Sequence, residues 1–261
     1  MDFLKSSKRR SFVSEVMYIA LNIALAAAVL ITILVTNSPL LAFALVILGK
    51  WRVFAVRPRY WFANVQANLV DVIVSLGIVV LTYQATGAVV AQVVLTIFYV
   101  IWLLFIKPRS KRLFIAAQAG CAVLLGTLAL ATVSYGWIAS VVVVGMWVIG
   151  YGAVRHVLSS YDESHTVLYS LIGGFIFAEI GWLTYHWTFA YNIPGAGDIK
   201  LAQVSLIALG LSFLMERAYA SYAKNKAIQT GDMILPTLLT LSIIAILILF
   251  FNDPTVGSGI S

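Results

Sequence analysis

The chain has 261 residues, of which 62% are hydrophobic and only 10% are Asp, Glu, Lys or Arg. Ordinary soluble domains are about 25% charged, so this chain has too few charges to cover a water-exposed surface. A soluble globular enzyme and a disordered regulator are therefore excluded, and the single cysteine excludes a disulfide-stapled secreted domain. The composition predicts a protein that crosses a membrane several times.

Apolar stretches separated by short connections run along the whole chain. A membrane-spanning helix needs about 20 mostly apolar residues, and nine stretches approach this length. We expect an all-α bundle that forms one transmembrane domain over residues 1–251, followed by a short flexible exterior tail over 252–261. The predicted spans are 12–35, 39–56, 63–84, 88–106, 113–135, 137–157, 167–189, 201–220 and 233–251.

The second stretch, 39–56, is the least regular of the nine. Its uncharged part ends at Gly49, and Lys50 and Arg52 follow. At 1.5 Å per residue, a helix of about eleven residues crosses only about half of a ~30 Å hydrocarbon core. The stretch spans the membrane only if the two basic side chains extend to the headgroups. A re-entrant hairpin over 39–49 is the alternative.

The distribution of basic residues supports the larger count. With nine spans, all Lys and Arg residues except Lys200 fall on the side of the N-terminus. Cytoplasmic loops carry an excess of Lys and Arg, so we expect the N-terminus inside and the C-terminus outside. Short loops without a glycosylation sequon fit the cytoplasmic membrane of a prokaryote, and we place the protein there.

Polar residues inside the predicted spans are the first candidates for function, because they are costly in hydrocarbon. Asn64, Asn68, Asp71 and Ser75 are spaced so that a helix places them on one stripe. We interpret the stripe as one wall of a polar path for a solute or an ion. Hydrogen bonding between helices is the alternative, and we expect that role for Gln118.

A second acid, Glu179, lies near the middle of span 167–189 and shares a helix face with Trp182 and His186. We assign Glu179 and His186 to the same path as Asp71. No Lys or Arg occurs in the middle of a predicted span to pair with either acid. Asp71 and Glu179 are therefore expected to be neutral hydrogen-bond donors, to face water, or to bind a proton or another cation.

Two basic clusters on the predicted cytoplasmic side are the second group of candidates. They fit contact with anionic lipid headgroups or with a phosphorylated lipid carrier; topology determination alone is the simpler explanation. Nucleic acid is not an expected partner, because the clusters lie against the bilayer. The residues are Lys50, Arg52, Arg57 and Arg59 in the first cluster, and Lys107, Arg109, Lys111 and Arg112 in the second.

The motifs that would identify an enzyme are missing from the sequence. It has no P-loop, HExxH or GxSxG pattern and no Cys/His cluster, so we expect no cofactor or metal and assign no catalytic residue. The favoured hypothesis is a transporter-, permease- or channel-like protein with a polar path through the membrane. The alternatives are a membrane-embedded enzyme or binding protein for an anionic lipid-linked substrate at the cytoplasmic face, and a structural subunit that contacts other membrane proteins or a second copy.

Overall fold

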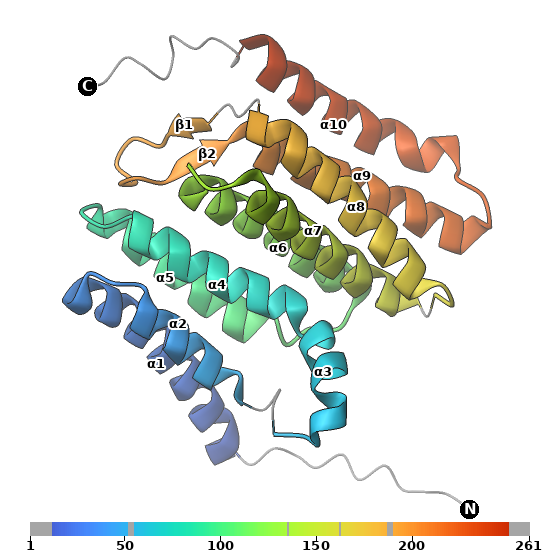
Figure 1. Cartoon of the computed structure of the whole chain (residues 1–261). Helices are drawn as coiled ribbons and strands as arrows, with labels where there is room; N and C mark the ends of the chain where they lie inside the picture. The colour runs from blue at the N-terminus through green and yellow to red at the C-terminus, as the bar shows by residue number, and fades with distance from the viewer. Residues whose placement is uncertain (1–11, 52–54, 135, 162, 187–189, 251–261) are drawn as a thin grey trace, which may run out of the picture.

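Long apolar helices, packed side by side with alternating direction, make up the structure (Figure 1). The computed structural model describes residues 12–51, 55–134, 136–161, 163–186 and 190–250; Arg52 and the predicted tail over 252–261 lie outside these ranges. The helices in the described residues are α1 (Phe12–Thr36), α2 (Leu40–Gly49), α3 (Trp61–Ala67), α4 (Leu69–Gln84), α5 (Val89–Ile101), α6 (Arg112–Val133), α7 (Ala139–Leu158), α8 (Thr166–His186), α9 (Gln203–Asn225) and α10 (Thr230–Phe250).

Seven helices of the described chain are long and apolar enough to cross a membrane, and their length and composition are compatible with the predicted helical membrane protein. These are α1, α5 with its continuation to Ile106, α6, α7 with its continuation to Tyr161, α8, α9 and α10. Helices α3 and α4 together would add an eighth, but they are bent by 68° relative to one another. Helix α2 has only ten residues.

The bend between α3 and α4 occurs at Asn68, inside a stretch that the sequence predicts as one continuous span. The backbone of Asn68 leaves helical geometry (φ −105°, ψ 8°), and its side-chain amide donates to the carbonyl of Asn64 at 2.8 Å. Asn side chains compete with helical hydrogen bonds in this way. The polar residues that predicted a stripe therefore also end the first helix.

The two ends of the bundle differ in charge. One end, here called the basic end, holds the connections after α2, α5, α7 and α9 (Figure 1). Its described basic residues are Lys50, Arg57, Arg59, Lys107, Arg109, Lys111, Arg112, Arg155, Arg217, Lys224 and Lys226. The opposite end holds Lys200 and a small antiparallel hairpin of β1 (Ala190–Asn192) and β2 (Lys200–Ala202). The hairpin is tied to the end of α4, because the backbone N–H of Asp198 donates to the carbonyl of Gln84 at 2.8 Å.

Glycines allow α7 and α8 to approach closely. A Cβ atom at Gly150 would lie 2.5 Å from the Cβ of Phe177, and one at Gly173 would lie 2.5 Å from a methyl group of Val154. Lipid tails are as apolar as leucine, so membrane helices associate through such close packing rather than through the hydrophobic effect. The α7–α8 pair therefore forms the most tightly packed part of the bundle.

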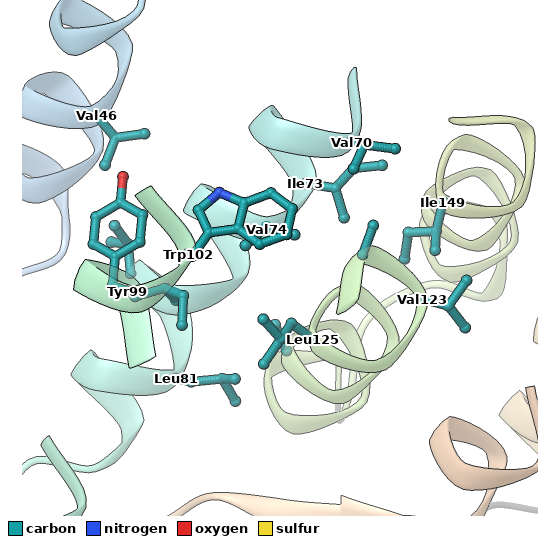
Figure 2. Packing of buried hydrophobic residues seen from close by; sticks show 14 of the residues in the cluster. Val46, Val70, Ile73, Val74, Leu81, Tyr99, Trp102, Val123, Leu125 and Ile149 are labelled. Atoms are coloured by element: carbon teal, nitrogen blue, oxygen red, sulfur yellow. The ribbon is translucent and has the colours of Figure 1, made fainter. Parts of the chain in front are cut away.

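Buried aromatic rings fill the space among α2, α4 and α5. Tyr99 and Trp102 are the largest fully buried side chains, and they lie beside Val46 and Val74 (Figure 2). Outside this core, large apolar side chains are exposed over most of the surface, as expected where a bundle faces lipid. The core places the indole of Trp102 next to α4, where Asp71 lies.

Candidate functional site: a buried ion cluster and an apolar cavity

Asp71, in the first turn of α4, is the centre of a buried ion cluster. The ammonium groups of Lys50 and Lys107 lie 2.5 and 2.8 Å from its Oδ2 atom. The indole N–H of Trp102 donates to Oδ1 at 3.1 Å, and Lys50 also donates to the hydroxyl of Ser75 at 2.9 Å. The side chains of Lys50 and Asp71 are only 10% and 11% exposed.

The expectation that Asp71 lacks a basic partner is therefore wrong. Both lysines directly follow a helix: Lys50 caps the short α2, and Lys107 follows the continuation of α5. A search for basic residues in the middle of spans misses such partners, because the side chains reach Asp71 from helix ends. The contacts occupy both carboxylate oxygens, so the cluster joins α2, α4 and α5 instead of presenting a free acid.

A π-helical turn, η3 (Trp102–Ile106), brings two of these partners to the same carboxylate. The backbone N–H of Lys107 donates to the carbonyl of Trp102, five residues earlier, at 2.9 Å. On an α-helix with 3.6 residues per turn, residues five apart point about 140° away from one another. The wider π-turn reduces this angle, and such turns occur frequently at functional sites. The hydroxyl of Tyr18 donates to the carbonyl of Leu103 within the turn at 3.2 Å.

Gln118 of α6 holds the chain just after this turn. Its amide nitrogen donates to the carbonyls of Ile106 at 2.7 Å and Arg109 at 2.9 Å, and its amide oxygen lies 2.7 Å from the Nε2 atom of His156 on α7. Carbonyls at the end of a helix have no partner within the helix, and Gln118 satisfies them. The prediction that Gln118 forms hydrogen bonds between helices is confirmed.

A cavity of about 920 Å³ lies among α6, α7, α8 and α9. Helix α8 packs on α7 and α9 packs on α6, whereas α8 and α9 have few contacts with one another. The cavity occupies the space that results. Most of its wall is apolar and includes Ala117, Gly120 and Leu124 of α6, Ile172 and Ile176 of α8, and Phe213 of α9.

Polar and aromatic side chains line the cavity at the basic end. They are Glu163, His165, Tyr169, Glu216, Arg217, Tyr219 and Tyr222, and we call them the mouth of the cavity. Tyr219 and Tyr222 lie near the end of a predicted span, where tyrosines are typical of the membrane–water interface. Glu163, His165 and Glu216 carry no sequence signal of a binding site, because the connection after α7 and the end of α9 meet only in the folded chain.

Hydrogen bonds and one ion pair hold the side chains of the mouth in place. The hydroxyl of Tyr219 donates to Glu163 Oε2, and the Nε of Arg217 lies 3.3 Å from Glu216 Oε2. The hydroxyl of Tyr161 donates a long hydrogen bond, 3.5 Å, to Glu216 Oε1. The bonds that the Tyr219 hydroxyl and the backbone N–H of His165 donate hold the pKa of the Glu163 carboxyl below its ordinary value.

The residues assigned to a polar path are distributed over separate places. Asp71 and Ser75 belong to the ion cluster, and Asn64 and Asn68 lie on α3 and at its end. Glu179 and His186 lie on the exposed face of α8, where His186 contacts the ring of Trp182. None of the six residues is among those that line the cavity.

The residues assigned to anionic headgroups fall into three groups with different contacts. Lys50 and Lys107 bind Asp71. Three of the guanidinium groups lie over aromatic rings at 4.6 Å from the ring centre: Arg59 over Tyr60, Arg109 over Phe114 and Arg112 over Tyr161. Arg57 and Lys111 are exposed at the basic end.

Comparison with known protein families, curated proteins and solved structures gives no match to the chain.

Proposed function

We propose that the chain is a multi-pass membrane protein that binds one amphiphilic molecule of the bilayer in the cavity among α6, α7, α8 and α9. The observation that supports this proposal is the distribution of side chains along the cavity, apolar over most of its length and polar at one end. An amphiphile fits this pattern with its hydrocarbon tail along α6 and α8 and its head group at the mouth. The volume of about 920 Å³ is within the range of ligand-binding cavities, roughly 300–1,000 Å³.

The proposal includes a topology. We propose that α2 and the bent α3–α4 pair each complete a pass, which gives nine passes, and that the basic end faces the cytoplasm of a prokaryotic cell. The asymmetric distribution of Lys and Arg supports this orientation. In it, Arg57, Arg59, Arg109 and Lys111 are placed to contact anionic lipid headgroups around the protein.

Binding is favoured over transport along the predicted polar path by the positions of the two acids. The path hypothesis needs Asp71 and Glu179 on one shared cavity. Asp71 is buried and paired with two lysines, and Glu179 lies on the exposed face of α8. The cavity is instead adjacent to the basic end, as expected of a binding protein for a lipid-like ligand.

A photo-crosslinking experiment tests the proposal. The purified protein in an uncharged detergent is irradiated with a dodecyl alcohol that carries a diazirine at the end of its tail, and labelled residues are mapped by mass spectrometry. We expect labelling to concentrate on lining residues such as Leu124, Ile176 and Phe213, above the exposed apolar residues of α1. Labelling in proportion to exposure over all helices would overturn the proposal.

Variants that fill the cavity provide the matched comparison. Ala117→Phe on α6 and Ser212→Phe on α9 enlarge two different walls, and we expect each to lower cavity labelling at least fivefold. Ala24→Phe enlarges an exposed alanine of α1 and should leave cavity labelling unchanged. Equal labelling in all three variants would contradict a tail-binding site in the cavity.

A further inference from the structure

The mouth of the cavity differs in charge from the basic end of the bundle, at which it lies. The described residues that line it include two carboxylates, Glu163 and Glu216, and one constantly charged cation, Arg217. Arg217 lies 3.3 Å from Glu216, so its charge is already matched. The mouth is therefore acidic, although most charged residues at this end are basic.

Aromatic rings surround these carboxylates. Tyr169, Tyr219 and Tyr222 line the cavity, and the ring of Tyr161 lies behind Tyr219 in an edge-to-face contact at 5.0 Å. Tyr169 and Tyr222 are 41% and 48% exposed, so part of each side chain is open to a ligand. The bond from the Tyr219 hydroxyl to Glu163 fixes its ring next to the carboxylate.

Resting on the proposed function, we infer that the head group of the bound amphiphile carries a positively charged ammonium. Cations are attracted to the faces of tyrosine rings, and aromatic groups are a recurrent way to bind quaternary ammonium ligands. Charge-assisted contacts to carboxylates are among the strong polar interactions. Glu216 retains capacity for such a contact, because the described part of the chain gives it one long hydrogen bond, from Tyr161, beside its ion pair.

An anionic head group fits the mouth less well. The lysines that would bind it, Lys50 and Lys107, are held at Asp71, and Arg112 lies over Tyr161 instead of lining the cavity. A phosphate at the mouth would face two carboxylates and one arginine, Arg217, whose charge is already matched by Glu216. The sequence expectation of an anionic lipid at the basic end therefore applies to the rim of the protein and not to this cavity.

Four photo-probes with the same dodecyl diazirine tail test the inference: trimethylammonium, primary ammonium, phosphate and hydroxyl head groups, each at the same mole fraction in uncharged micelles. We expect the two ammonium probes to label the cavity about tenfold more than the phosphate probe. Glu216→Gln and, separately, Glu163→Gln should reduce this preference at least threefold. Glu15→Gln, on the exposed face of α1, should leave it unchanged.

The hydroxyl probe separates the two proposals and controls for folding. Its cavity labelling should be the same in wild type and in both mouth variants, because it carries no charge. Equal cavity labelling by all four probes, or a preference for phosphate, would overturn the ammonium inference and leave tail binding intact. Absence of cavity labelling by every probe would overturn both. If one mouth variant loses labelling by the hydroxyl probe, its cavity is no longer formed. The ammonium preference is then judged from the mouth variant that retains hydroxyl labelling.

Discussion

Lys50 and Asp71 form a buried ion pair, with 2.5 Å between the lysine Nζ and the aspartate Oδ2. Lys50 directly follows α2, and Asp71 lies in the first turn of α4. The pair therefore fixes the end of a helix that is too short to cross a membrane unaided. Each side chain supplies the charge that makes burial of the other tolerable.

Removal of the Asp71 charge tests this relationship. Asp71→Asn leaves Lys50 buried without its carboxylate, and loss of one partner of a buried ion pair costs about 3 kcal/mol or more. We expect a decrease of that size in the free energy of unfolding, measured by titration with a denaturing detergent. Glu179→Gln, on the exposed face of α8, is the matched carboxyl-to-amide control and should change it by about 0.5 kcal/mol or less. Equal losses in the two variants would contradict a stabilising role specific to Asp71.

A methyl group at Gly150 tests the close packing of α7 against α8. In Gly150→Ala the new Cβ would lie 2.5 Å from the Cβ of Phe177, and overpacking of this kind costs about 1–3 kcal/mol. We expect a lower melting temperature in detergent. Gly231→Ala, where the new Cβ would meet no atom within 4 Å apart from chain neighbours and the backbone of its own helix, should melt like the wild type. The additional change Phe177→Ala should recover part of the loss in Gly150→Ala, and failure to recover it would point away from this contact.

The lowered pKa of Glu163 makes the stability of the folded protein depend on pH in the acid range. A carboxyl with a lower pKa in the folded state stabilises the fold above its unfolded pKa, and this stabilisation is lost as the pH falls through the folded value. The groups around Glu163 are the Tyr219 hydroxyl, Ser164 and His165. Because Tyr219 donates the bond that contributes most, Tyr219→Phe should make the melting temperature less sensitive to pH below the ordinary pKa of Glu.

Tyr185→Phe controls for the loss of a tyrosine hydroxyl. The hydroxyl of Tyr185 donates to the carbonyl of Trp137 at 2.7 Å, which does not titrate. The melting temperature of this variant should differ from that of the wild type by the same amount at every pH between 3 and 7. Unchanged acid sensitivity in Tyr219→Phe would show that Glu163 does not carry the effect.

Reporter fusions test the proposed topology. Fusions after residues 60, 110 and 225 should report the cytoplasm, and a fusion at the C-terminus should report the exterior. These positions follow from nine passes with the basic end inside. A cytoplasmic C-terminus would contradict an odd number of passes.

The sequence predicts the helices well because hydrophobic length is a local property. The structure confirms helices within the long apolar stretches and the contact role of Gln118. It differs where the outcome depends on helix ends or on neighbours. Asn68 breaks a predicted span through a bond to Asn64, and Lys50 reaches Asp71 from beyond its helix.

The candidate site was less predictable than the fold for a related reason. Periodicity places Glu179, Trp182 and His186 on one face of a helix, but it does not indicate whether that face is directed inward or outward. The cavity depends on how far α8 and α9 are held apart by their contacts with α7 and α6. Such a distance is a property of the assembled bundle, and the local sequence of Glu163 or Glu216 contains no sign of it.

The π-turn at the end of α5 determines how this segment would respond to a change in its length. Trp102 and Lys107 reach one carboxylate because the chain accommodates one residue more than an α-helical turn holds. Deletion of a single residue between them would leave the two residues four apart, and on an α-helix residues four apart point only about 40° away from one another. Both side chains would therefore still face Asp71 after the deletion, whereas an α-helical turn of the present length would direct them about 140° apart. The π-turn thus corresponds to one inserted residue that the helix accommodates without loss of either contact to Asp71.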